Sequence, residues 1–183
     1  MILHRCFAWN ARARPDGAGG PLAFPRLFQG EGRHDNPDVY GCLYLADRES
    51  SAVVEQLARF RGQRLVPELL VRRGLPLALA ALALPDDAEL VDLDEPRVLE
   101  ANRLRPSLVA TRARSVTQPQ ALALYRRRER AAGLRWWSVF ESLWTNFTIF
   151  DRAAPVLRAG PVRGLTLEDP AVAEAAEALG LAR

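Results

Sequence analysis

The segment from Gly30 to Phe60 constrains the fold most, because three kinds of local structure follow one another within it. Its first part, 30–41, contains three glycines and an Asn-Pro pair, a composition that favours turns over regular structure. The apolar run Cys42–Ala46 is typical of a buried strand. Asp47 then suits the N-cap of a helix that has Glu49 in its first turn. We therefore expect a loop, a strand and a helix that fold back on one another.

One hydrogen-bonding side chain stands on each of these pieces: Arg33 on the loop, Tyr44 on the strand and Glu55 on the helix. Neighbouring members of the set are eleven residues apart along the chain. Segments of this length can pack against one another, so all three side chains can meet in one cleft. The sequence therefore predicts a candidate site that contains these three residues.

Arg33 and Tyr44 each have a functional and an ordinary interpretation. A guanidinium on a glycine-rich loop suits a phosphate, because its planar fork meets two oxygens at once. The ordinary alternative is a surface ion pair of Arg33 with Asp35 or Asp38. Tyr44 lies in the middle of the strand, and its side chain points to the face opposite to Leu43 and Leu45. It either packs in the core or presents its hydroxyl to a ligand.

Glu55 is the residue for which helical periodicity is most informative. Val53, Leu57 and Phe60 recur as an apolar stripe, and Glu55 falls on the opposite side of the helix. Periodicity alone favours a solvent-facing pair with Arg59, four residues later. The small residues beside Glu55 also leave room for a ligand, whose positive charge a carboxylate would stabilise. Both interpretations stay open at this level.

Length and charge describe a single soluble domain. The 183 residues suffice for one domain with a sizeable core. All 25 positively charged side chains are arginine, and the net charge is only +3. The one dense basic run, 126–130, fits the solvated face of a helix better than a nucleic-acid interface, and we expect no direct nucleic-acid partner.

No membrane or metal partner is expected either. The longest apolar run, Leu75–Leu84, has ten residues and contains Pro76, so it is too short to cross a bilayer. The first residues lack an apolar core followed by a cleavage site, and we expect a cytoplasmic protein without a secretory signal. Cys6 and Cys42 are isolated, which predicts buried reduced thiols and no metal site.

The remaining elements mix strands and helices without a strict alternation, which predicts an α+β fold in one compact domain. Expected strands are 1–10, 75–84, 89–93, 108–111, 135–140, 146–150 and 156–162. Expected helices are 48–61, 95–102, 118–132 with Thr117 as N-cap, and 170–179 closed by Gly180.

Two of the later strands carry further polar candidates. Ser138 follows a pair of tryptophans, and Asn146 begins the next strand. No histidine stands in a hydrolase motif that would activate a serine, so Ser138 is interpreted as a hydrogen-bond donor and not as a nucleophile. Satisfaction by the strand backbone is the ordinary alternative.

The glycine loop, the strand and helix after it, and the later strands resemble the RES domain family. The residues that carry the resemblance are Gly32-Arg33, Leu43–Ala46, Ala52 with Glu55, Gly133–Ser138 and Asn146–Phe150. The resemblance runs from about Arg5 to Asp151, and we take 1–183 as a single RES domain. One departure is at the loop, where many members have Arg-Trp-Asn or Arg-Phe-Asn and this chain has Arg33-His34-Asp35-Asn36.

The resemblance implies a fold similar to the ADP-ribosyltransferase toxins, with two small sheets flanked by helices around a nucleotide cleft. It implies an enzyme that degrades NAD by breaking the bond between nicotinamide and ribose, with water or phosphate as acceptor. NAD is then a substrate, and no metal is needed. Arg33, Tyr44 and Glu55 would be catalytic. Substrate binding would involve Arg5, Arg33, Tyr44, Trp137, Ser138 and Asn146, with the Tyr44 ring stacked on nicotinamide or its ribose and Arg5 on the phosphates or paired with Glu55.

The resemblance also implies a toxin whose partner is a helix-turn-helix antitoxin of the Xre type. Two alternatives remain: transfer of ADP-ribose to a protein or small molecule, and a catalytically idle nucleotide-binding or interaction protein. Presence of the whole set Arg33, Tyr44, Glu55 and Ser138 disfavours the idle form. The acceptor and any oligomeric state are left open.

Overall fold

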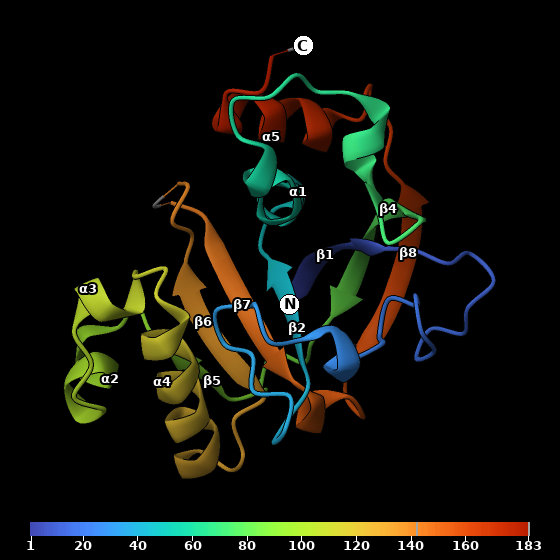
Figure 1. The fold of residues 1–183 in the computed structure, drawn as a ribbon. Helices are drawn as coiled ribbons and strands as arrows, with labels where there is room; N and C mark the ends of the chain where they lie inside the picture. The colour runs from blue at the N-terminus through green and yellow to red at the C-terminus, as the bar shows by residue number, and fades with distance from the viewer. Residues whose placement is uncertain (142, 183) are drawn as a thin grey trace.

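The computed structural model describes residues 1–141 and 143–182 and confirms a mixed α+β fold in one compact domain (Figure 1). Its strands are β1 (Ile2–Ala8), β2 (Cys42–Ala46), β3 (Val71–Arg72), β4 (Leu75–Ala83), β5 (Leu90–Asp92), β6 (Gly133–Trp137), β7 (Thr145–Phe150) and β8 (Arg158–Gly164). Its α-helices are α1 (Glu49–Leu57), α2 (Pro96–Ala101), α3 (Pro106–Val109), α4 (Arg114–Arg127) and α5 (Pro170–Leu179). Short 3₁₀ turns are Arg26–Phe28, Ala58–Phe60, Pro67–Leu70 and Asp151–Ala153.

The strands form one connected sheet in the order β3-β4-β1-β2-β7-β6-β5, with β8 paired to β4. Only the β5–β6 pair is parallel among the strand pairs of the described residues. The expected two small sheets appear as two halves, which meet at the single pair His4–Ala46 between β1 and β2. The two halves therefore diverge from this junction, and each carries its own group of helices.

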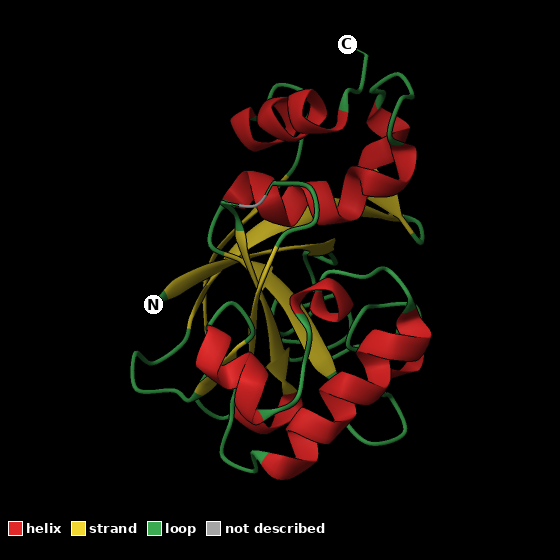
Figure 2. Cartoon of the chain, turned by 90° about the vertical axis from the view of Figure 1, so that its left-hand side faces the viewer, coloured by secondary structure: helices red, strands yellow, loops and turns green. Residues whose placement is uncertain are grey.

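The helices lie in two groups at opposite ends of the sheet (Figure 2). In one group, α1 packs against α5 and the β4 side chains, with Val53 and Leu57 facing Val172 and Leu179. In the other group, α4 packs on β6 and β7, where Leu124 contacts a cluster that includes Phe150. Within the described part of the chain, no helix has both the length and the apolar character needed to cross a membrane.

Two secondary-structure predictions around residues 108–132 were wrong. Of the expected strand 108–111, residues 108–109 instead end the short helix α3, and 110–111 follow it without regular structure. The helix begins at Pro106, a residue with a backbone angle suited to a first helical turn. The helix α4 begins at Arg114, before the predicted N-cap Thr117, and ends at Arg127 instead of residue 132. The Thr117 hydroxyl is not a cap, because it donates to the carbonyl oxygen of Arg33 at 2.6 Å. Tertiary contact therefore overrides the local capping signal.

Two smaller boundaries also differ from the sequence prediction. The N-cap position of α1 is Arg48 and not Asp47, whose carboxylate instead accepts from the Thr145 N–H at 3.2 Å. Strand β6 ends at Trp137, so Ser138 lies in the turn that follows the strand. Other predicted elements agree to within a few residues, and Cys6 and Cys42 are buried free thiols as expected.

Candidate active site

Alternation along β2, β7 and β6 places one set of polar side chains on a single face of the sheet. Tyr44 is the register partner of Thr148, and Asn146 lies between Ala46 and Trp136. Side chains of register partners stand on the same face. This face is bordered by α1 on one side and by α4 with the glycine loop on the other, so both helix groups contribute to the site.

Asp35 organises the glycine loop. Its buried carboxylate accepts from the N–H groups of Gly30 (2.8 Å) and Gly32 (2.7 Å), and from the Tyr44 hydroxyl (2.7 Å). A Cβ at Gly32 would lie 2.4 Å from the Tyr44 hydroxyl oxygen, so the loop needs glycine there. From the sequence, Asp35 was expected only as an ion-pair partner for Arg33. Its spacing from Gly32 in a turn-rich segment was the signal for a side chain that bonds to its own backbone.

Tyr44 uses its hydroxyl within the protein. The hydroxyl donates to Asp35 and accepts from the main-chain N–H of His34 at 2.9 Å. Burial, with Cys42 and Asp35 nearby, raises the pKa of Tyr44 well above its usual range. Tyr44 therefore fixes the loop from the strand, while stacking of its ring on a ligand stays a prediction.

Arg33 is buried, with 7% of its surface exposed, and does not form the surface ion pair with Asp35 or Asp38 that the sequence had left open. Its Nη1 donates to the carbonyl oxygens of Val109 (2.6 Å) and Thr111 (2.8 Å). The guanidinium carbon lies 4.9 Å from the centre of the Trp136 ring, a cation–π arrangement. Burial lowers the pKa of Arg33, and the Glu55 carboxylate opposes this shift.

Glu55 points toward the sheet and not toward solvent. Its Oε1 accepts from the Asn146 amide at 2.9 Å, and the Asn146 oxygen accepts from the Ser51 hydroxyl at 3.0 Å. Ser51 and Glu55 are four residues apart, so they share one face of α1. Arg59, the alternative partner, is exposed and donates to the Gln56 carbonyl instead.

The surroundings of Glu55 favour its protonated form more than water does. Burial raises the pKa of Glu55 above its ordinary value of 4.5, whereas Arg33 and the Asn146 hydrogen bond lower it. Periodicity had favoured an exposed Glu55 because it assumes one buried helix face. The helix α1 is buried on both sides, by α5 and by the sheet. A partly desolvated carboxylate beside a guanidinium is an arrangement common at functional sites.

A second polar cluster surrounds Trp136, the ring on which the Arg33 guanidinium lies. The Nδ1 atom of His34 lies 2.7 Å from the Thr148 hydroxyl, which also accepts from the Trp136 indole N–H at 3.1 Å. The His34 ring meets Trp136 edge-on, with 5.4 Å between ring centres. Burial and the nearby Arg33 lower the pKa of His34 to about 3, so the ring is neutral at physiological pH. No function was predicted for His34 from the sequence.

Arg5 lies with the loop at 20–23 and not with Glu55. Its guanidinium donates to the carbonyl oxygens of Gly20 (3.2 Å), Pro21 and Ala23 (3.0 Å). The expected ion pair with Glu55 does not occur among the described residues. Burial lowers the pKa of Arg5 to about 10. In this structure Arg5 fastens a loop, and its contact with a dinucleotide stays a prediction.

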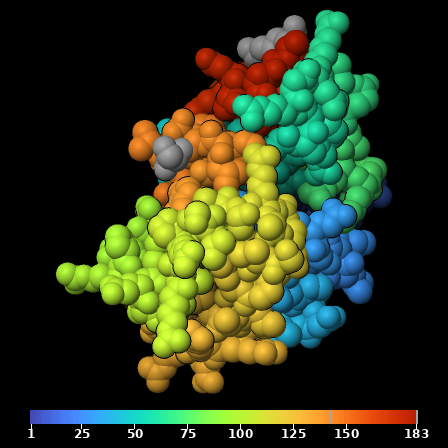
Figure 3. Space-filling view, turned by 60° about the vertical axis from the view of Figure 1, so that its left-hand side comes forward, coloured from blue at the N-terminus to red at the C-terminus, as the bar shows by residue number. Residues whose placement is uncertain are grey.

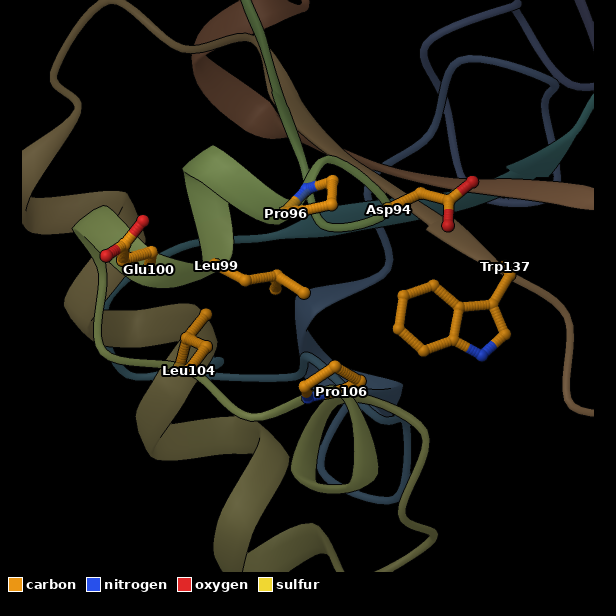
Figure 4. Close-up of a pocket in the computed structure, with 7 residues that line it drawn as sticks. All are labelled: Asp94, Pro96, Leu99, Glu100, Leu104, Pro106 and Trp137. Carbon is orange, nitrogen blue, oxygen red and sulfur yellow. The ribbon is translucent and has the colours of Figure 1, made fainter.

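Trp137 lies in a pocket apart from Arg33 and Glu55. This pocket has a volume of about 480 Å³ and is lined by α2, α3 and the Trp137 ring (Figure 4). The other lining residues are Asp94, Pro96, Leu99, Glu100, Leu104 and Pro106. The titratable groups whose pKa is shifted by burial in the polar cluster, Arg33 and Glu55, are not among the lining residues of this pocket. We therefore take the polar cluster, and not this pocket, as the candidate active site.

Ser138 is buried in the turn after β6. Its N–H donates to the Trp144 carbonyl at 2.8 Å, and its hydroxyl oxygen accepts from the Phe140 N–H at 3.2 Å. These bonds are local, so the backbone interpretation of Ser138 describes the structure as it stands. Across residues 1–141 and 143–182, no three His, Cys, Asp or Glu side chains converge as ligands for a metal ion.

The comparisons with known proteins agree with this architecture. The sequence matches the RES domain family over residues 3–171. Among solved structures, the chain is similar to one from the crystal structure of the M. tuberculosis MbcT–MbcA toxin–antitoxin complex. The TM-score is 0.67 at 17% identity, over 98% of this chain and 88% of the other. No curated protein matches the chain.

Proposed function

The chain belongs to the RES domain family, and from this premise we propose that it degrades NAD by cleaving the bond between nicotinamide and ribose. The observation that carries the proposal is the Glu55 carboxylate, which Asn146 holds at the face of the sheet where Arg33 of the glycine loop lies over Trp136. A carboxylate there meets the chemical demand of the reaction, because positive charge develops on the ribose as the nicotinamide leaves.

The proposed reaction needs no group beyond the chain and its substrates. The pyridinium nitrogen takes the electron pair of the glycosidic bond and leaves as neutral nicotinamide. Glu55 stabilises the cationic ribose or orients the oxygen of the acceptor that attacks it. With water as acceptor, the products are ADP-ribose, nicotinamide and a proton. With phosphate as acceptor, ADP-ribose phosphate forms in place of ADP-ribose.

The raised pKa of Glu55 supports a function in proton transfer. A carboxyl whose pKa moves toward neutrality is a stronger base than one in water, and it accepts a proton from an attacking water more readily. Asn146 would orient the carboxylate, since its amide donates to Oε1 while Ser51 fixes the amide from the other side. The Arg33 charge lowers the pKa of Glu55 and so favours the ionised carboxylate.

We also propose that this activity belongs to the toxin of a toxin–antitoxin pair in the cytoplasm, with an Xre-type antitoxin as partner. The support is the family itself and the similarity in fold to a protein solved as part of a toxin–antitoxin complex. The gene beside this one offers a direct test: co-expression of its product should suppress the NAD loss that the chain causes when it is expressed alone.

The enzymatic proposal is tested by incubating the purified chain with NAD, with and without phosphate, and separating the products by chromatography. We expect free nicotinamide in equal molar amount to an ADP-ribose product, and the product formed with phosphate identifies the acceptor. Intact NAD in both reactions, with a protein that melts cooperatively, would refute the proposal. A protein of a cell extract that becomes labelled during incubation with labelled NAD would instead favour transfer of ADP-ribose.

A further inference from the structure

Two arginines outside the predicted site, Arg112 and Arg114, lie on the segment 110–114, here called the strap. The strap runs from the end of α3 to the first residue of α4. The strap is fastened to the glycine loop from several directions. Arg33 donates to the Thr111 carbonyl at 2.8 Å, and Arg114 Nε donates to the Glu31 carbonyl at 2.7 Å. In Figure 3 the yellow segment that contains the strap lies against the teal region of α1 and the orange region after β6. The strap therefore borders the candidate site.

The side chains of the strap arginines are held by different groups. Arg114 Nη1 donates to the Arg112 carbonyl at 2.7 Å, which ties the two residues together. The Arg112 guanidinium lies 5.3 Å from the centre of the Phe140 ring, next to the turn that contains Ser138. Both side chains are exposed, whereas Arg33 is buried behind them.

The charges of this cluster do not balance. Arg33, Arg112 and Arg114 lie near the Glu55 carboxylate. The other carboxylate of the cluster, Asp35, already accepts hydrogen bonds from the glycine loop and from Tyr44. Each of the three guanidinium groups lowers the pKa of Glu55, and the two strap arginines also lower the pKa of Arg33. Across the described residues, none of the three forms an ion pair with an acidic side chain. Three guanidinium groups therefore stand against two carboxylates, Glu55 and Asp35, and the exposed Arg112 and Arg114 have no acidic partner among the described residues.

We propose that Arg112 and Arg114 bind the pyrophosphate of the dinucleotide, as a site separate from the carboxylate that receives its cationic end. This inference rests on the proposed function and adds the residues that orient the substrate. A pyrophosphate carries two negative charges, one for each strap arginine, and a guanidinium group can bind two phosphoryl oxygens at once. Glu55 and the strap arginines then give the two ends of the site opposite charge. NAD, with a pyridinium at one end and a pyrophosphate in the middle, fits that polarity in one direction only.

Inorganic phosphate used as acceptor offers the same chemistry from another source. One phosphate would occupy part of a basic cluster, whereas a diphosphate would span two guanidinium groups. The two sources are separated by comparing ADP and inorganic pyrophosphate with orthophosphate as ligands. Since ADP has no nicotinamide–ribose bond, its binding is measured whether or not the chain cleaves NAD.

The experiment compares Arg112→Gln/Arg114→Gln with Arg126→Gln/Arg127→Gln, a pair of exposed arginines at the far end of α4. Calorimetric titration with ADP and pyrophosphate should show a loss of affinity of about a hundredfold in the strap variant, or about tenfold for each arginine. The control pair should bind as the unmodified chain does. The affinity difference should shrink as salt is raised, because exposed charges are screened.

The single variant Arg112→Gln controls for a loss of folding in the double variant. It should fold normally, because the Arg112 side chain donates no hydrogen bond within the described residues. It should keep the melting temperature and still lose about tenfold in ADP affinity. Equal ADP affinity in the strap variant, the control and the unmodified chain would overturn the inference. A loss confined to orthophosphate would also overturn it. Full ADP binding without NAD cleavage would refute the proposed function and leave this inference standing.

Discussion

Replacing Glu55 by glutamine separates a catalytic carboxylate from a structural one. In the unmodified chain the Asn146 amide donates to the Glu55 carboxylate at 2.9 Å. A glutamine oxygen can accept the same hydrogen bond, so the substitution removes the charge and little else. If Glu55 stabilises the cationic ribose, its loss should raise the barrier by about 3 kcal/mol, which is about a hundredfold in kcat. Binding of NAD should change less than kcat does, because in the ground state Glu55 meets only the pyridinium charge, whereas the charge on the ribose develops in the transition state.

The same substitution should not destabilise the protein. The pKa of Glu55 is raised in the fold, so the folded state binds the proton more tightly than the unfolded state does. Its contribution to stability therefore falls as pH rises from 4.5 through the raised pKa, and above that pKa the ionised carboxylate is less stable in the folded than in the unfolded chain. A neutral amide removes this cost. We expect a melting temperature equal to or above that of the unmodified chain.

The assay is kcat, the dissociation constant of NAD and the melting temperature for Glu55→Gln, with Arg59→Gln as the matched control. Arg59 is an exposed residue on the turn that follows the helix and does not contact Glu55. A large loss of rate in the first variant alone, with both proteins stable, supports the reasoning. Equal rates in the two variants, or a Glu55→Gln protein that melts well below the control, would show that the carboxylate is structural.

Three further perturbations test the groups around Glu55. Arg33→Lys should weaken NAD binding about tenfold in a calorimetric titration, because an ammonium cannot reproduce the planar fork; equal affinities would remove Arg33 from the binding site. Asp35→Asn should lower the free energy of unfolding by about 2–4 kcal/mol in urea titrations, since an amide cannot accept from Gly30, Gly32 and Tyr44 together; an unchanged midpoint would mean that the loop holds without the carboxylate. Because the pKa of His34 falls from 6.5 to about 3 on folding, the unfolded state binds more protons, and stability should be lost as pH falls from 6.5 toward 3. His34→Gln should flatten this dependence, and identical curves for the two proteins would contradict the buried neutral ring.

Local sequence was sufficient for the elements that repeat a simple pattern. The apolar run at Cys42–Ala46 gave β2, and Asp169 with Gly180 marked the two ends of α5. Family motifs then pointed to Arg33, Tyr44 and Glu55 as parts of one region. These signals act over a few residues, so they are present in the sequence without knowledge of the fold.

The character of the site depended on contacts between distant segments. The two carbonyls that bind Arg33 are 76 and 78 residues away in the chain, and Asn146, which holds Glu55, is 91 residues away. Periodicity treats a helix as having one buried face, and it could not show that α1 is covered on both sides. The short apolar run at 108–111 suits a strand by local pattern, but it ends α3 and enters the strap because of its contacts with the glycine loop. The amino-acid sequence by itself determined the mixed fold and the residues of its central motif. Only the tertiary structure decided which of these residues are buried, which groups hold them and which arginines lie near the carboxylate. These properties depend on side chains that meet although they are far apart in the chain.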